Sequence, residues 1–359
     1  MSRPSWQHAS HILCVRLDTV GDVLMCTPAM RAIKQSRPGR QVSLLTSRGG
    51  AAAAPYLPEV DAVLQYCAPW VGSSAAHAPF IDAAMVQSLT AAQFDAAVIF
   101  SARHQSALPA AMLCYLAGIP LRLAHCRENP HHLLTHWVED HEPGKLMRHD
   151  VQRQLDLVGS VGFEAESASL SFAVPEEDLS RVERHLASLG IGQHQRLVIM
   201  HPGANTRAPC FPAALWADVI CGLWQRGGYA IVLAGEVQER PLIDEIRTLC
   251  RAPFHSLAGL LHPGQLGAAM RLASVVVCAN ASAAHMAMAV GTPQVNLHAL
   301  AHPQRPLSPL AIRLQLPEAR CNNCCQSTCA PGQCACTGAL SPNQVIDAIC
   351  SFAERKISA

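Results

Sequence analysis

The segment of residues 12–34, ILCVRLDTVGDVLMCTPAMRAIK, limits what this chain can fold into more than any other stretch. Four apolar residues at its start have the length of a buried strand. A short loop with Gly21 follows, and from Asp22 onward apolar residues recur at helical spacing. Asp22 is a residue type that begins helices well. A strand, a glycine-bearing turn and a helix that opens on a carboxylate are typical of an open parallel α/β sheet, in which ligands bind at the carboxyl ends of the strands.

The same alternation continues through the first half of the chain. Apolar runs predict further strands at residues 41–46, 62–66, 94–100 and 121–124. Helical spacing predicts helices at residues 105–117 and 150–161. Residues 67–80 are expected to form a loop, and residues 125–149, rich in His, Pro and charge, an irregular segment that faces an acceptor.

A second series of strands and helices begins after Pro175. Strands are expected at residues 196–200, 229–234, 254–257, 274–278 and 294–297, and helices at 176–189, 212–226, 241–250, 263–272 and 283–290. With 359 residues, two domains are the natural expectation. We therefore predict an α/β protein with two Rossmann-like, doubly wound domains, residues 1–174 and 175–345, followed by a helix or tail at 346–359. Two such domains facing each other across a cleft form the GT-B arrangement.

Composition and motifs exclude several classes of protein. The formal net charge is +1, which argues against a nucleic-acid-binding protein that acts through a strong basic field. No G-x-G-x-x-G follows an expected strand and no G-x-x-x-x-G-K-S/T occurs, so neither a dehydrogenase nor a P-loop NTPase is indicated. No secretory signal is expected, and the longest apolar run, residues 107–121, is shorter than a membrane span.

Three expected strand ends carry polar residues: Asp22, the HPGANTR segment at 201–207 and the ANASAAH segment at 279–285. Together with GEVQE at 235–239 they resemble glycosyltransferase family 9, the ADP-heptose:lipopolysaccharide heptosyltransferases. RLDTVGDVLMCTPAMRAIK is similar to the opening motif of that family, IMHPGANTR and FPAALWADV to the opening of its second domain, and VLAGEVQER to its Gly-x-x-x-Glu segment. LAGLLHPGQLGAAMRLA and VVVCANASAAHMAMAVGTPQVNL resemble its donor-site region.

The resemblance implies inverting, metal-independent transfer of a sugar from a nucleotide-diphosphate donor, expected to be ADP-heptose, to a glycan or glycolipid acceptor in lipopolysaccharide biosynthesis. Asp22 matches the position of the general base, which takes the proton of the attacking acceptor hydroxyl. The residues that match the donor site are Gly203, Asn205, Thr206, Arg207, Glu239, Asn280, Ser282 and His285. Backbone N–H groups, Arg207 and a helix N-terminus would stabilise the leaving diphosphate, and Glu239 would bind ribose hydroxyls. Candidate acceptor residues are Gly21, Arg103, His104, Arg122 and Arg127.

The implied setting is the cytoplasm, with a peripheral contact to the inner membrane left open. Where the family has Asp-Ser/Thr-Gly in the donor segment, this chain has Asn280-Ala281-Ser282. This departure leaves three alternatives open: a transferase with another nucleotide-sugar donor or a protein acceptor, a nucleotide-sugar epimerase, and a non-catalytic nucleotide-sugar-binding protein.

Six cysteines lie between residues 321 and 336, and the four at C-x2-C-x4-C-x6-C spacing match a pattern found in some members of the family: Cys321, Cys324, Cys329 and Cys336. Four thiolates at short spacing bind zinc or iron tetrahedrally. The alternative is free or reversibly oxidised thiols, because cytosolic disulfides are rare. In either case we expect a structural and not a catalytic role.

Overall fold

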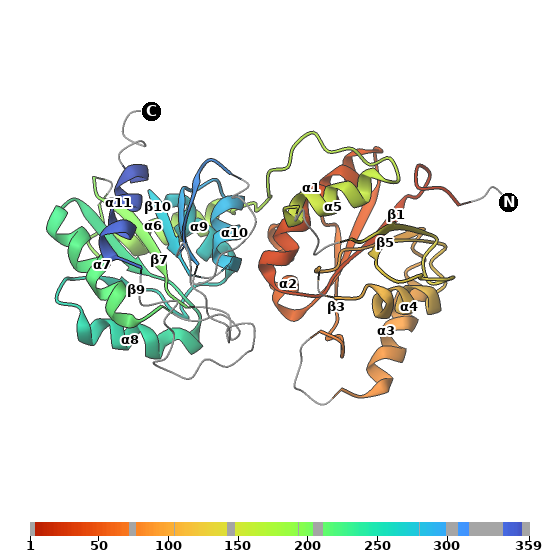
Figure 1. Cartoon of the computed structure of the whole chain (residues 1–359), viewed down its shortest axis with the longest axis horizontal. Helices are drawn as coiled ribbons and strands as arrows, with labels where there is room; N and C mark the ends of the chain where they lie inside the picture. Colours follow the sequence, from red (N-terminus) through yellow and green to blue (C-terminus); the bar gives the residue numbers. More distant parts are fainter. Residues whose placement is uncertain are drawn as a thin grey trace. The chain divides into compact units, whose positions relative to one another are not determined.

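The structure of the chain is a computed structural model that describes residues 4–71, 77–103, 105–141, 148–192, 194–203, 211–279, 281–298, 308–315 and 340–353. The chain divides into two compact units, residues 1–173 and 174–359, drawn in red to yellow-green and in green to blue in Figure 1. Each unit is an α/β layer structure built on its own parallel sheet.

The first unit holds six parallel strands in the order β3-β2-β1-β4-β5-β6. Their bounds are β1 His11–Arg16, β2 Gln41–Thr46, β3 Ala62–Gln65, β4 Ala96–Ile99, β5 Leu121–Cys126 and β6 His136–Glu139. The helices are α1 Val20–Gln35, α2 Arg48–Ala53, α3 Pro79–Ala91, α4 Leu108–Leu116 and α5 Asp150–Gly159, with a 3₁₀ turn η1 at Ala54–Tyr56. In such a strand order, ligands bind beside the first strand, where the direction of winding reverses. That point lies between β1 and β4.

The core of the first unit explains why β1 reads as an uninterrupted apolar run. Helices α1, α2 and α5 gather on one face of the sheet, and α3 and α4 on the other (Figure 1). A strand covered on both faces buries every side chain. Leu13 and Val15 of β1 pack with Leu89 of α3 and Leu113 of α4 in one apolar cluster.

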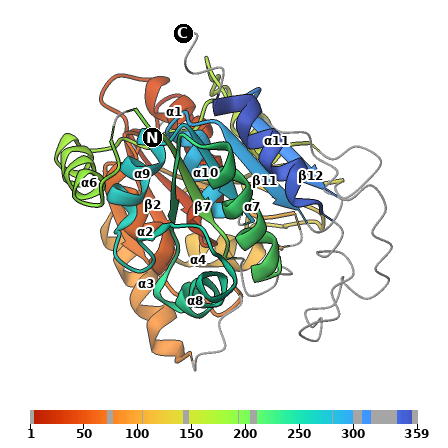
Figure 2. The ribbon, with the colours of Figure 1, turned by 90° about the vertical axis from the view of Figure 1, so that its left-hand side faces the viewer.

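The second unit repeats the plan, with six parallel strands in the order β12-β11-β10-β7-β8-β9. The strands are β7 Arg196–His201, β8 Tyr229–Leu233, β9 His255–Ser256, β10 Val275–Cys278, β11 Gln294–His298 and β12 Ala311–Gln315. The helices are α6 Glu176–Ser188, α7 Ala213–Arg226, α8 Arg240–Leu249, α9 Pro263–Leu272, α10 Ala281–Ala289 and α11 Pro342–Ala353, with a 3₁₀ turn η2 at Val237–Glu239. Helix α11 packs beside α7 on one face of the sheet, and α6, α9 and α10 lie on the other (Figure 2). Here the winding reverses between β7 and β10.

Two strands correct the sequence-based expectations. Strand β6 lies inside residues 125–149, which were expected to be irregular, and β12 was not expected at all. Both are edge strands whose side chains are mostly half-buried or exposed, so neither carries a strong apolar signal. Helix α3 was also not predicted, because it buries only Leu89 and its sequence shows no clear apolar face. None of the helices in the described ranges combines the length and hydrophobicity that a membrane span needs.

Candidate functional site

The first helix begins at a capping box, which corrects the expected start of that helix. Thr19 is the N-cap, and Asp22 lies three residues into α1. The Thr19 hydroxyl accepts from the Asp22 N–H at 3.4 Å, and it donates to Oδ2 of Asp22 at 2.6 Å. The Thr19 N–H also donates to Oδ2 at 3.0 Å. The carboxylate is therefore held against the N-terminus of α1, at the end of the sheet where ligands bind.

A buried guanidinium orients the same carboxylate from the other side. Arg16, the last residue of β1, is 2% exposed and places Nη2 at 3.0 Å from Oδ1 of Asp22. Its Nε lies 3.0 Å from Oδ2 of Asp18. Burial acts to lower the pKa of Arg16, but Cys26, Asp22 and Asp18 outweigh it, so this pKa lies above its ordinary value. Arg16 thus stays charged and fixes Asp22, whose side chain remains 24% exposed and accessible to a substrate.

The candidate acceptor residues fall into different environments. Gly21 is buried in the first turn of α1. Arg103 follows β4 and pairs with Oδ1 of Asp150 at 2.8 Å. Arg127 follows β5, and its Nε lies 3.6 Å from Oδ2 of Asp140. Arg103 and Arg127 thus lie at the carboxyl edge of the sheet.

Arg122 lies at the other end of its strand. It is the second residue of β5, it is buried, and its guanidinium donates to the backbone oxygens of Leu133 at 2.7 Å, of His132 at 2.9 Å and of Ile119. Burial lowers the pKa of Arg122. This geometry gives Arg122 a structural role, because its donors are used inside the fold.

A hollow of about 200 Å³ opens beside Arg127 and is lined by Gln105, Ser106, Ala107, His125, Cys126, Arg127, Glu128 and Asp140. Behind it, the fully buried Arg153 donates to Oδ2 of Asp140 at 3.0 Å and to the carbonyl of Ser101 at 2.6 Å. His125 Nε2 lies 2.9 Å from the Arg153 carbonyl. Burial and the Arg153 charge lower the pKa of His125 to about 4, so the imidazole is neutral. Sequence reasoning missed Asp140 because it lies in a segment without periodicity or a motif. It missed Arg153 because the apolar spacing of the expected helix at residues 150–161 does not show that an arginine on it is buried.

In the second unit, two expected donor residues come together at the carboxyl edge of the sheet. Gly203 follows β7, and Glu239 ends the 3₁₀ turn after β8. A Cβ atom on Gly203 would lie 1.4 Å from Oε1 of Glu239, and one on Gly235 would lie 2.5 Å from Oε2. Oε2 also accepts from the Glu236 N–H at 2.6 Å. Close glycine contacts thus fix an acidic side chain beside the point where the winding of this sheet reverses.

His201, the last residue of β7, was not expected at this site. Its Nε2 lies 3.8 Å from Oε2 of Glu239, and its side chain is 8% exposed. The expected donor residues Ser282 and His285 lie half-buried in the first half of α10, which follows β10. Because β7 and β10 are neighbours, the segments after both strands lie at the same edge.

Several sequence-based candidates lie outside the described residues: His104, Asn205, Thr206, Arg207, Asn280 and the cysteines Cys321, Cys324, Cys329 and Cys336. Among the residues that the structure does describe, no three His, Cys, Asp or Glu side chains gather in a way that could hold a metal ion.

Comparison with known proteins identifies the class. A family model described as glycosyltransferase family 9 (heptosyltransferase) matches residues 83–335. The chain belongs to this family, as the motifs predicted, and it is a heptosyltransferase-like glycosyltransferase. Lipopolysaccharide heptosyltransferase 3 from Escherichia coli K12 is 23% identical over 281 residues, which cover 77% of this chain and 79% of that protein.

Solved structures confirm the predicted fold class. A glycosyltransferase of family 9 from Veillonella parvula superimposes with a TM-score of 0.78 at 16% identity and covers 99% of both chains. Escherichia coli ADP-heptose lipopolysaccharide heptosyltransferase II gives a TM-score of 0.74 at 19% identity, covering 97% of this chain and 99% of that one. An iron-containing dodecameric glycosyltransferase, TibC from enterotoxigenic Escherichia coli, gives 0.52 at 12% identity, covering 99% of this chain and 78% of that one.

Proposed function

We propose that this protein is an inverting, metal-independent transferase that moves a heptose from ADP-heptose to a lipopolysaccharide core or a related glycan, with Asp22 as the general base. The observation that carries the proposal is the environment of Asp22. The carboxylate lies at the N-terminus of α1, is oriented by Arg16 and Thr19, and stays partly exposed at the ligand-binding edge of the sheet.

The proposed reaction is a single displacement. The acceptor hydroxyl gives its proton to Asp22 as its oxygen attacks the anomeric carbon, and the bond from that carbon to the diphosphate oxygen breaks. A positioned base contributes roughly 10²–10⁴-fold to such a step. Of the candidate acceptor residues, Arg103, His104 and Arg127 would bind anionic groups of the acceptor, and Gly21 would let it approach the first turn of α1.

The second unit would hold the donor. Glu239 offers two carboxylate oxygens to ribose hydroxyls, and its position against Gly203 and Gly235 supports that role. Gly203, Asn205, Thr206 and Arg207 would bind the diphosphate. The helix α10 would face it with its N-terminal dipole, through Asn280, Ser282 and His285. Asn280 is uncharged where the family has an acid, which favours a second candidate: transfer from another nucleotide sugar or to a protein acceptor.

The test compares wild type with Asp22→Asn. The amide of the variant still accepts from Thr19, so we expect a folded protein whose melting temperature rises normally with ADP but which transfers no sugar. Retained turnover would remove Asp22 from the mechanism. A wild type that is stabilised by UDP or GDP instead of ADP would favour the other donor, and interconversion of free nucleotide sugar without an acceptor would indicate an epimerase. Nucleotide binding without any reaction would indicate a non-catalytic protein.

We also propose a structural zinc or iron ion on Cys321, Cys324, Cys329 and Cys336. The support is the thiolate chemistry of this spacing together with the iron that TibC contains. No step of the transfer uses this ion. Elemental analysis of the purified protein should find close to one metal ion per chain, and Cys324→Ser should reduce that value. A metal content near zero in protein purified under reducing conditions would leave these residues as free thiols.

If the acceptor is a glycolipid, the protein would bind it at the cytoplasmic face of the inner membrane, and we propose that α4 makes a peripheral contact with that membrane. The helix α4 carries no charged residue and exposes Met112, Tyr115 and Leu116, which lie on one helical face. Apolar and aromatic tips of this kind enter the interfacial region of a bilayer. In a flotation assay with lipid vesicles, wild type should be found in the vesicle fraction, and a Met112→Ser/Leu116→Ser variant should remain in the unbound fraction.

A further inference from the structure

His201 contacts each of the three sequence segments that match the donor site. It is the last residue of β7 and begins the HPGANTR segment. Its backbone carbonyl accepts from the Ala279 N–H at 3.3 Å, at the start of the ANASAAH segment. Its Nε2 lies 3.8 Å from Oε2 of Glu239, in the GEVQE segment. One residue therefore joins parts of the candidate donor site that are far apart in the chain.

The alternation of β7 decides which face of the sheet carries the imidazole. Val198 and Met200 pack in the apolar cluster that includes Trp216 of α7. Successive side chains of a strand point to opposite faces, so His201 faces the other side of the sheet. Helix α10, with Ser282 in its first turn, covers that side. The imidazole is thus buried on the same face as the helix that would bind the diphosphate.

Few groups restrain the carboxylate of Glu239. Oε2 accepts from the Glu236 N–H at 2.6 Å. The next residue, Arg240, directs its Nε to the Ala258 carbonyl at 3.1 Å, so this guanidinium is used elsewhere. Among the residues that the structure describes, His201 is the basic side chain that lies within ion-pair distance of Glu239.

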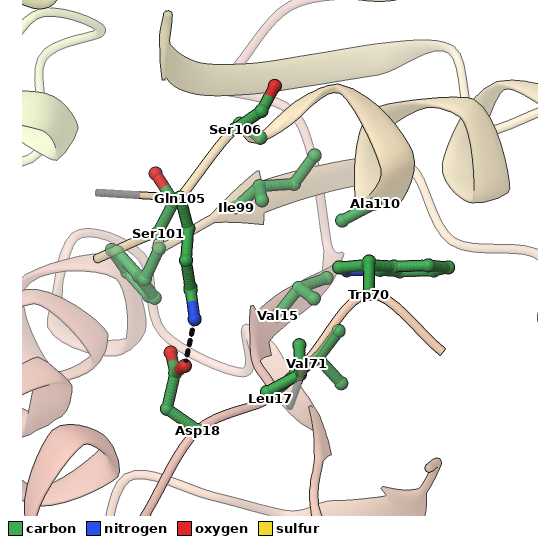
Figure 3. A pocket seen from close by; sticks show the side chains of 12 residues that line it. Val15, Leu17, Asp18, Trp70, Val71, Ile99, Ser101, Gln105, Ser106 and Ala110 are labelled. Atoms are coloured by element: carbon green, nitrogen blue, oxygen red, sulfur yellow. Dashed lines mark hydrogen bonds between the residues drawn. The ribbon is translucent and has the colours of Figure 1, made fainter. Parts of the chain in front are cut away.

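The first unit shows how an acid at the carboxyl edge of a sheet is held when an arginine is present. Nε of Arg16 lies 3.0 Å from Oδ2 of Asp18, and the Gln105 amide donates to Oδ1 at 2.6 Å (Figure 3). Each carboxylate oxygen therefore has a partner that fixes it. Glu239 has no arginine partner of this kind in the described part of the second unit, and His201 lies where such a partner would be.

We propose that His201 is a positioning residue of the donor site, which holds the Glu239 carboxylate in place for the ribose hydroxyls and thereby selects a ribonucleotide. A protonated imidazole at this distance forms an ion pair with the carboxylate, and a neutral one with its Nε2–H toward Oε2 attracts it as a dipole. Without His201 the carboxylate must be ordered when the ribose binds, which costs affinity. This inference rests on the proposed function, in which Glu239 binds ribose.

The test compares the affinities of ADP and 2′,3′-dideoxy-ADP, which lacks both ribose hydroxyls, by isothermal titration calorimetry. His201→Leu should weaken ADP binding about 3- to 10-fold, the value of one hydrogen bond, and leave the dideoxy form within about twofold of wild type. Gln offers an N–H near the place of Nε2, so His201→Gln should keep the ADP affinity. His185→Leu is the matched control, because His185 is exposed on α6 of the same unit.

Transfer kinetics give a second readout. His201→Leu should raise the donor KM and leave kcat and the acceptor KM little changed, because the group that it positions binds the donor and does not take part in the displacement. The ratio of the ADP and dideoxy-ADP affinities is measured within one protein, so a general loss of stability in the variant does not imitate the effect.

A preference for ADP that is lost in His201→Leu and restored in His201→Gln supports the inference. If His201→Leu keeps the preference of wild type, or if both variants lose it equally, His201 does not position Glu239, while the proposed function stands. If wild type binds UDP or GDP in place of ADP, the proposed donor fails, and the same ratio with that nucleotide and its dideoxy form decides the role of His201. A wild type that binds no nucleoside diphosphate overturns both.

Discussion

The carboxylate of Glu239 lies where a side chain at residue 203 would be, since a Cβ atom on Gly203 would come within 1.4 Å of Oε1 of Glu239. A Cβ atom on Gly235 would approach Oε2 to 2.5 Å. The two glycines follow neighbouring strands, β7 and β8, so the acid is held between the ends of both. This relationship explains why the segments HPGAN and GEVQE belong to one site although they lie far apart in the sequence.

Gly203→Ala should therefore displace Glu239 without unfolding the protein. The overlapping atoms belong to the end of a flexible side chain, which can turn away at the cost of its bond to the Glu236 N–H. We expect a loss of about 1 kcal/mol in unfolding free energy, the usual value of such a cap, and a much smaller ADP-induced rise in melting temperature. In a Glu239→Ala background the overlap no longer exists, so Gly203→Ala should then cost less in denaturant titrations. An equal cost in both backgrounds would contradict the contact.

Removing Arg16 should destabilise the first unit. In Arg16→Leu the carboxylates of Asp18 and Asp22 would face each other without their shared cation. Removing one partner of a fully buried ion pair costs about 3–5 kcal/mol of unfolding free energy. Because the carboxylates of Asp18 and Asp22 are 12% and 24% exposed, we expect a somewhat smaller loss of roughly 2–4 kcal/mol. The measurement is urea unfolding followed by circular dichroism. Arg181→Ala is the control, because its pair with Glu177 is exposed and should contribute less than about 0.5 kcal/mol. Equal effects would show that Arg16 is not structurally important.

The buried His125 predicts a loss of stability in acid. Burial and the charge of Arg153 lower the pKa of His125 from 6.5 to about 4. Between these values the unfolded chain binds a proton that the folded chain does not, so stability falls as the pH drops from 6.5 to 4 and the loss is complete below 4. The loss amounts to about 3 kcal/mol at most. Unfolding of His125→Gln should depend less on pH in this window, and curves that run parallel to wild type would rule out His125 as the cause.

A pair of thiols in the second unit should form a disulfide on oxidation. The Sγ atoms of Cys221 on α7 and Cys250 after α8 lie 3.6 Å apart. With hydrogen peroxide, two thiols give one disulfide and two waters. Burial raises the pKa of Cys250 to about 11, so oxidation should be faster at alkaline pH, where more thiolate is present. Closing a loop between two cysteines that are 29 positions apart in the sequence adds at most about 3–4 kcal/mol of stability.

Peptide mapping without reduction locates this bridge among the 16 cysteines of the chain. The linked peptides should contain Cys221 and Cys250 and should disappear in Cys221→Ser. Oxidation that links other cysteines first, while Cys221 and Cys250 stay reduced, would contradict the prediction.

The sequence predicted the bounds of the central strands more accurately than those of the edge strands. Strand β2 has the bounds that its apolar run predicts, and β1, β4 and β7 differ by one or two residues at an end. Central parallel strands are covered on both faces, so nearly all of their residues are apolar and the strands can be recognised in the sequence as continuous apolar runs. The edge strands β6 and β12 are covered less, and their mixed composition resembles that of a loop.

In the candidate site, too, some residues could be recognised from the sequence and others could not. Asp22, Gly203 and Glu239 stand out in the sequence because each belongs to a short motif with its own backbone requirement: a helix start, a close approach or a tight turn. Arg122 was expected to bind the acceptor, but it lies at the start of β5, away from the carboxyl edge, and it donates to backbone carbonyls inside the fold. A basic residue close to an expected strand does not show at which end of that strand it lies.

The sequence alone determined the alternation of strands and helices, the doubled α/β plan and the family motifs, because hydrophobic periodicity and turn chemistry are local properties. Only the tertiary structure decided which polar groups meet. The contact of Arg16 with both Asp18 and Asp22 and the enclosure of Glu239 by two glycines depend on strand order and burial. Neighbouring strands in these sheets are distant in the chain, so the distances that set charge, hydrogen bonding and pKa arise only when the sheet has formed.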